Sequence, residues 1–106
     1  MDTKEYELKI TPAAAEDLEN IYKYIKDALL SKSVAENMVI EINEKIRSLK
    51  HFPYKCELSR DISLRLRGYR RLIIKNYVVL YLINEKKNQV IIARIFYGPM
   101  DYAAHI

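Results

Sequence analysis

The hydrophobic pattern of this chain changes period once, close to Pro53. Before that proline, two stripes of apolar residues recur at spacings of three and four, which is typical of amphipathic helices. After it, β-branched and aromatic residues come in short runs with brief polar connections, which is typical of strands joined by tight turns. The chain is therefore expected to combine a helical hairpin with an antiparallel sheet.

The N-terminal segment predicts one strand followed directly by a helix. Residues 6–10 alternate apolar and polar side chains, as a half-buried strand does. Thr11 then offers an N-cap and Pro12 a first helical residue that needs no N–H partner. The apolar stripe of this first helix extends over 18–29.

A second helix is expected after a short break at residues 31–32. Ser33 and Glu36 have the spacing of a capping box, so the helix is predicted to start there. Its apolar stripe runs from Ala35 to Leu49 and stops before Phe52. The two helices form an antiparallel hairpin.

The C-terminal half predicts the sheet. Residues 62–67 alternate apolar and polar side chains, which would place Arg65 and Arg67 on one face of an extended chain. The runs at 69–74, 77–83 and 89–97 form an antiparallel meander, because their connections are too short for crossovers. We predict a single α+β domain spanning residues 1–106, in the order strand–helix–helix–strand–strand–strand. The helical hairpin packs on one face of a four-stranded, mainly antiparallel sheet.

Charge is distributed unevenly along the chain. Residues 1–61 carry 10 Lys and Arg against 12 Asp and Glu, a sum of −2, whereas residues 62–106 carry 8 against 2, a sum of +6. No acidic residue occurs from 62 to 84. This asymmetry points to a polyanionic partner, either a nucleic acid or an acidic protein segment. A generic basic surface is the competing interpretation.

Composition excludes several other classes. No apolar run is long enough for a transmembrane helix, and the acidic N-terminus does not resemble a signal peptide, so we expect a cytoplasmic protein without a membrane partner. The single Cys56 has no partner for a disulfide or for a cysteine-based metal site. We expect neither a metal nor a cofactor.

The order of these elements, with several short motifs, resembles the RelE/ParE toxin family. The resemblance rests on the Thr-Pro-led helix, the run from Gly68 to Tyr77, the run from Arg94 to Gly98, and the segment that ends at Tyr102. It covers nearly the whole chain. It implies the toxin of a type II toxin–antitoxin pair, with roles in growth inhibition and plasmid stabilisation, neutralised by a small acidic antitoxin.

Family members differ in their targets. RelE-like toxins cleave mRNA on the ribosome without a metal, whereas ParE-like toxins poison DNA gyrase by binding. Cleavage by a ribose 2′-hydroxyl needs a base, a cation at the phosphate and an acid for the leaving oxygen. Here Val78 and the sequence Gly98-Pro99-Met100 replace basic residues of the RNA-cleaving branch, and Phe96 replaces a histidine. These departures favour a ParE-like toxin.

Three interpretations are kept: a ParE-like gyrase inhibitor, a RelE-like endoribonuclease with an altered catalytic set, and an attenuated toxin that acts only as a regulator with its antitoxin. Whether the chain is an enzyme, and whether it forms a homodimer, stays open. The candidate catalytic residues are Arg70, Arg71 and Tyr97. The candidates for binding nucleic acid or the target are Arg65, Arg67, Arg70, Arg71, Lys75, Arg94 and Tyr102. Arg70 and Arg71 fall on opposite faces of a strand, so at most one can point into a shared site.

Overall fold

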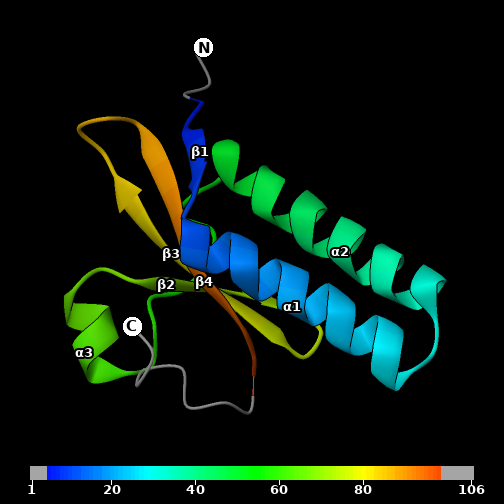
Figure 1. Cartoon of the computed structure of the whole chain (residues 1–106). Helices are drawn as coiled ribbons and strands as arrows, with labels where there is room; N and C mark the ends of the chain where they lie inside the picture. The colour runs from blue at the N-terminus through cyan, green and yellow to red at the C-terminus, as the bar shows by residue number, and fades with distance from the viewer. Residues whose placement is uncertain (1–4, 99–106) are drawn as a thin grey trace.

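The computed structural model describes residues 5–98 and forms two layers, a helical hairpin and a sheet, with a short helix on the far side of the sheet (Figure 1). The elements follow one another as β1 Glu7–Ile10, α1 Pro12–Ala28, α2 Lys32–Arg47, the 3₁₀ turn η1 Ser48–Lys50, α3 Ile62–Leu66, β2 Arg70–Ile74, β3 Tyr77–Asn84 and β4 Gln89–Tyr97. The α+β class and the packing of the hairpin on one sheet face are confirmed.

The sheet has the strand order β1-β4-β3-β2. The last three strands form the predicted antiparallel meander, and β1 pairs in parallel with the first half of β4, with Ile10 opposite Ile92. An irregularity in the β3–β4 register, where Leu80 faces Arg94 and Tyr81 faces Ile92, leaves Ala93 as an extra residue in β4. Such a bulge bends the strand locally.

The start of α1 is the best-predicted boundary of the fold. Thr11 is the N-cap and its hydroxyl accepts a hydrogen bond from the Ala14 N–H at 3.1 Å. The same hydroxyl lies 3.0 Å from the Ile92 carbonyl oxygen and 2.9 Å from that of Ala93. One threonine therefore begins the helix and ties it to the bulge in β4.

Two predicted features of the hairpin are wrong. α2 is capped by Ser31, whose hydroxyl accepts from the Val34 N–H at 3.2 Å, and not by Ser33. Both serines have a suitable cap spacing, and the chain reverses direction early enough to use the first one. Leu29, placed in the first apolar stripe, is exposed because α1 ends at Ala28.

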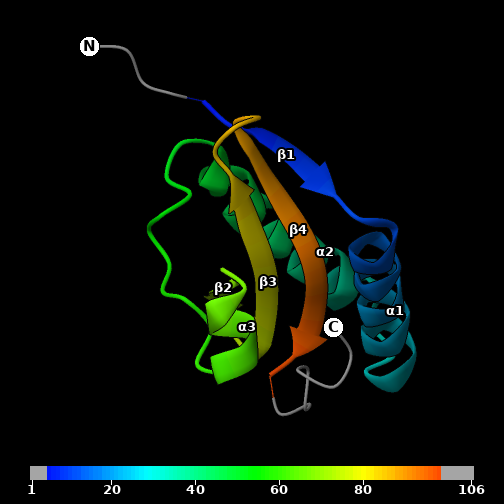
Figure 2. The same ribbon diagram turned by 90° about the vertical axis from the view of Figure 1, so that its left-hand side faces the viewer.

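The core lies mainly between the hairpin and the sheet. The side chains buried there come from both helices, from η1 and from alternate positions of the strands: Ala14, Ile25, Ala35, Met38, Ile42, Ile46, Leu49, Leu72, Ile74, Val79, Tyr81, Val90, Ile92 and Ile95. A smaller cluster on the other face joins α3 to the sheet through Leu64, Tyr69, Val78, Leu80 and Phe96. Figure 2 shows α3 on the side of the sheet away from α1 and α2. Thus β3 is buried on both faces, as its continuous apolar sequence predicts.

The prediction of extended chain at 62–67 is also wrong. Residues 62–66 form α3, and Asp61 caps the helix by accepting from the Leu64 N–H at 3.0 Å. A helix of this length buries one side, so Leu64 is 2% exposed while its alternating neighbours Ile62 and Leu66 are 65% and 82% exposed. Arg65 and Arg67 consequently do not share a strand face.

Candidate functional site

Most candidate basic residues lie in separate places and are already held by partners inside the molecule. Arg94, in the middle of β4, makes a bidentate ion pair with Asp17 of α1, with Nε and Nη2 at 2.8 and 2.9 Å from the carboxylate oxygens. The guanidinium also lies over the Phe96 ring, 4.7 Å from its centroid. The Asp17 carboxylate raises the pKa of Arg94 further. Arg94 therefore fixes α1 against the sheet.

Arg70 and Arg71 begin β2 and, as the strand alternation requires, point to opposite faces. Arg70 donates from Nη1 to the Cys56 carbonyl oxygen at 2.6 Å and lies 4.9 Å from the Tyr54 ring centroid. Arg71 forms an ion pair with Glu57 at 3.1 Å. Both arginines thus hold the loop before α3 against the outer edge of the sheet.

Lys75 lies in the β2–β3 turn, where its φ of 52° is left-handed. Its ammonium group is 3.2 Å from a carboxylate oxygen of Glu41 in α2. This ion pair joins the β2–β3 turn to α2 of the hairpin. Because the Lys75 side chain is largely exposed, the contribution of this pair to stability is expected to be small.

Tyr97 ends β4 on the hairpin side of the sheet. Its ring meets that of Tyr77 edge to face, with the centroids 5.9 Å apart. Burial raises the pKa of Tyr77. Two adjoining grooves of about 480 and 610 Å³ share Tyr24, Tyr77 and Tyr97 as lining residues, and lie between the free end of the hairpin and the end of the sheet.

The three catalytic candidates are not brought together. Tyr97 lies opposite Tyr77, which lies opposite Ile74, so it is at the other end of β2 from Arg70 and Arg71. The offset is three to four residues along the strands, on the order of 10–13 Å, plus two strand spacings of about 4.8 Å each. Tyr102 lies outside the described residues.

Arg65 and Arg67 have a different environment, because both belong to α3 or its C-terminal end and both are exposed. Arg67 lies over the Tyr69 ring, 5.2 Å from the centroid. Within residues 5–98, no ion pair is formed by Arg65, Arg67 or the nearby Arg60. We call the surface made by Arg60, Ile62, Arg65, Leu66 and Arg67 the α3 surface.

Sequence reasoning missed the apolar part of the α3 surface and its neighbour Arg60. A signal was present, since Asp61 stands three residues before Leu64, the spacing of an N-cap and the N–H that it accepts. The residues between them alternate, however, and a five-residue segment is too short for the two periods to be separated.

The described part of the chain offers few features for metal chemistry or membrane insertion. Among residues 5–98, no three His, Cys, Asp or Glu side chains gather into a group that could hold a metal ion. No helix there is long and apolar enough to cross a membrane.

Several solved structures are similar to this fold. A chain of the chromosomal ParDE toxin–antitoxin system from P. aeruginosa aligns with a TM-score of 0.74 and 22% identity, over 89% of this chain and 97% of its own. A chain of the RelBE2 toxin–antitoxin complex from Mycobacterium tuberculosis gives 0.61 and 18%, over 91% and 94%. A mutant of the E. coli toxin RelE in the free state gives 0.63 and 12%, over 95% and 92%.

These structural likenesses establish the fold. No curated protein sequence matches the chain. The sequence model of the ParE toxin of the type II toxin–antitoxin system parDE, however, matches residues 8–102, nearly the whole chain. The match includes the capped start of α1, the hairpin, α3 and the complete meander. The chain therefore belongs to the ParE toxin family of type II toxin–antitoxin systems.

Proposed function

We propose that this toxin acts by binding DNA gyrase and that a small acidic antitoxin neutralises it. The observation that carries the proposal is the ParE family match over residues 8–102. The separation of Arg70 and Arg71 from Tyr97 adds support, because cleavage of RNA needs its base, its acid and its phosphate-binding cation around one phosphate.

The proposed contacts with the target or the antitoxin are Arg65, Arg67, Arg70, Arg71, Lys75, Arg94 and Tyr102. The six of these residues that the structure describes have two kinds of environment. Arg70, Arg71, Lys75 and Arg94 already have partners within the fold, so their loss would act partly through stability. Arg65 and Arg67 have guanidinium groups at the surface, where an external partner can reach them.

The proposal is tested with purified DNA gyrase, relaxed plasmid and ATP. We expect the chain to inhibit supercoiling and to leave gyrase-linked DNA breaks that appear after protease treatment. The premixed antitoxin should abolish both effects. Normal supercoiling without breaks, at a tenfold molar excess of a folded chain, would contradict the proposed target.

A second assay addresses the ribonuclease alternative. Primer extension on an mRNA in a purified translation system should give an uncut message in the presence of the chain. Cuts within ribosome-bound codons would establish a RelE-like activity, despite Val78 and the separated candidates. Activity in neither assay would favour the attenuated regulator.

The same proposal has consequences in cells. We expect expression of the chain alone in the cytoplasm to inhibit growth, and coexpression with the antitoxin to restore it. A plasmid that carries both genes should be retained better than one that carries neither. Sedimentation of the free toxin tests whether it forms a homodimer.

A further inference from the structure

Around α3 gathers positive charge that has no counterion among residues 5–98. Residues 57–71 contain five arginines and two acidic residues. Both acidic side chains are already in use, since Glu57 pairs with Arg71 and Asp61 caps α3. Within the part of the chain that the structure describes, no carboxylate thus balances the charge of Arg60, Arg65 and Arg67.

Two exposed aliphatic side chains lie between these arginines. Ile62 and Leu66 are four residues apart and so project from one side of α3. They are 65% and 82% exposed. Leu64, on the opposite side of the helix, is buried against the sheet. An apolar centre with a charged rim is the arrangement that protein–protein interfaces share.

The α3 surface is also held firmly in place. Leu64 packs with Tyr69, Leu80 and Phe96 on the sheet. Before the helix, the Ser59 N–H donates to the Tyr69 carbonyl oxygen at 2.8 Å, and Leu58 forms a β-bridge with Arg70. A partner therefore meets a preformed helix and does not have to order it, which favours affinity.

A polypeptide matches this surface better than a nucleic acid does. Arginines alone would suit phosphates, but a phosphate backbone offers nothing that covers Ile62 and Leu66. An acidic segment with apolar side chains satisfies both components.

We propose that the α3 surface binds an acidic, apolar-containing segment of the neutralising antitoxin. This inference rests on the proposed function, which supplies the antitoxin as the lasting partner. Ile62 and Leu66 form the buried centre of the contact, and Arg60 and Arg65 pair with carboxylates at its rim. Arg67 remains over Tyr69 and supports the end of the helix.

The test measures the affinity between the full chain and its antitoxin, which we expect a neighbouring gene to encode, by calorimetry in 0.1 M salt. The charge-reversal variant Arg60→Glu/Arg65→Glu is expected to raise the Kd at least about 100-fold, roughly tenfold per ion pair. The variant Leu66→Glu should raise it at least about tenfold. Both changes lie on exposed side chains, so thermal unfolding should show folded proteins.

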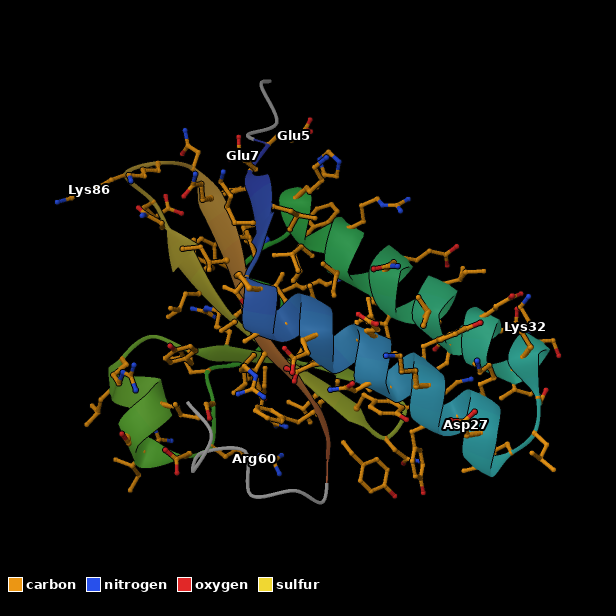
Figure 3. All side chains as sticks on the ribbon, viewed as in Figure 1. Glu5, Glu7, Asp27, Lys32, Arg60 and Lys86 are labelled. Carbon is orange, nitrogen blue, oxygen red and sulfur yellow. The ribbon has the colours of Figure 1, made fainter. Side chains whose placement is uncertain are left out.

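The matched control is Lys86→Glu/Lys87→Glu, which changes the net charge by the same amount. These lysines lie in the exposed β3–β4 turn, and Figure 3 shows Lys86 near the top of the view, well apart from Arg60 near the bottom. The control is expected to keep the wild-type Kd within about threefold. If it weakens binding as much as the α3 variant does, general charge attraction explains the effect and the docking site is refuted.

Other outcomes also decide. Unchanged affinity in both α3 variants, or no complex between the wild-type chain and the neighbouring protein, would overturn the inference. Full affinity for that protein with loss of the effect on gyrase would assign the surface to the target. If the α3 variants lose only their binding to a DNA duplex and keep full affinity for the neighbouring protein, the surface would be assigned to nucleic acid. Failure of the wild-type chain in the gyrase assay, with α3-dependent binding intact, would reject the proposed target and leave the docking site standing.

Discussion

Asp17 provides a hydrogen-bond acceptor for the part of the β4 edge that β1 does not pair with. β1 pairs with β4 only as far as Ile92, and one oxygen of the Asp17 carboxylate accepts from the Ile95 N–H at 2.9 Å. The same carboxylate holds Arg94 in its bidentate pair. A single helical side chain thus satisfies both a strand N–H and a half-buried guanidinium.

We expect Asp17→Ala to lower the free energy of unfolding by about 2–4 kcal/mol, because it leaves the Arg94 charge and a strand N–H without this acceptor. Urea titration followed by far-UV ellipticity measures the change. Glu19→Ala is the control, since the Glu19–Lys23 pair is exposed and should cost less than about 0.5 kcal/mol. Equal effects of the two variants would show that the Asp17 contacts carry little energy.

Tyr81 offers a prediction that depends on pH. Its hydroxyl donates to the Pro53 carbonyl oxygen at 2.6 Å within the core, and burial raises its pKa above the ordinary value near 10. The protonated form is therefore favoured by folding, and its contribution is present below pH 10 and lost as the pH rises above that value. Tyr81→Phe should cost about 1–3 kcal/mol at pH 7.

The same variant tests the sign of the pH effect. The urea midpoint of the wild type should fall between pH 9 and 11, and that of Tyr81→Phe should fall less. Phenol absorbance at 295 nm should show, in the variant, one fewer tyrosine with a raised pKa. A parallel fall in both proteins would mean that other tyrosines dominate.

At the level of elements, α3 is where sequence and structure differ most. Leu64 and Leu66 occupy equivalent positions in an alternating pattern but opposite sides of the observed helix. Leu64→Ala should lower the free energy of unfolding by about 2–4 kcal/mol, because it empties the centre of the smaller cluster. Leu66→Ala should change it by less than about 0.5 kcal/mol. Urea unfolding of the two variants measures this difference. Similar losses of stability in both would favour an extended chain at residues 62–67.

What the sequence could predict depended on how much chain each signal covered. Two helical stripes and a meander with tight turns each span many residues, so their type and order were right. Thr11-Pro12 is the single cap signal at the start of α1, whereas Ser31 and Ser33 are both possible N-caps at the start of α2. Partners such as Asp17 for Arg94 come from distant segments, and no local pattern announces them.

On the scale of the whole molecule, the two hydrophobic clusters share one sheet. Val79 and Leu80 are neighbours in β3 and are both fully buried, one on each face. Loss of the sheet therefore removes both clusters at once. We expect a single cooperative unfolding transition, with coincident midpoints by far-UV ellipticity and tyrosine fluorescence. Midpoints that differ between the two signals would contradict a single transition.

The pairing of β1 with β4 determines when the sheet can be completed as the chain is synthesised. Glu7 lies opposite Gln89, so β1 waits for a partner strand that the ribosome makes only after both helices of the hairpin, α3, β2 and β3. Local hairpins form quickly, but a contact between such distant segments must await the synthesis of β4. A growing chain can therefore complete its four-stranded sheet only once β4 has emerged from the ribosome.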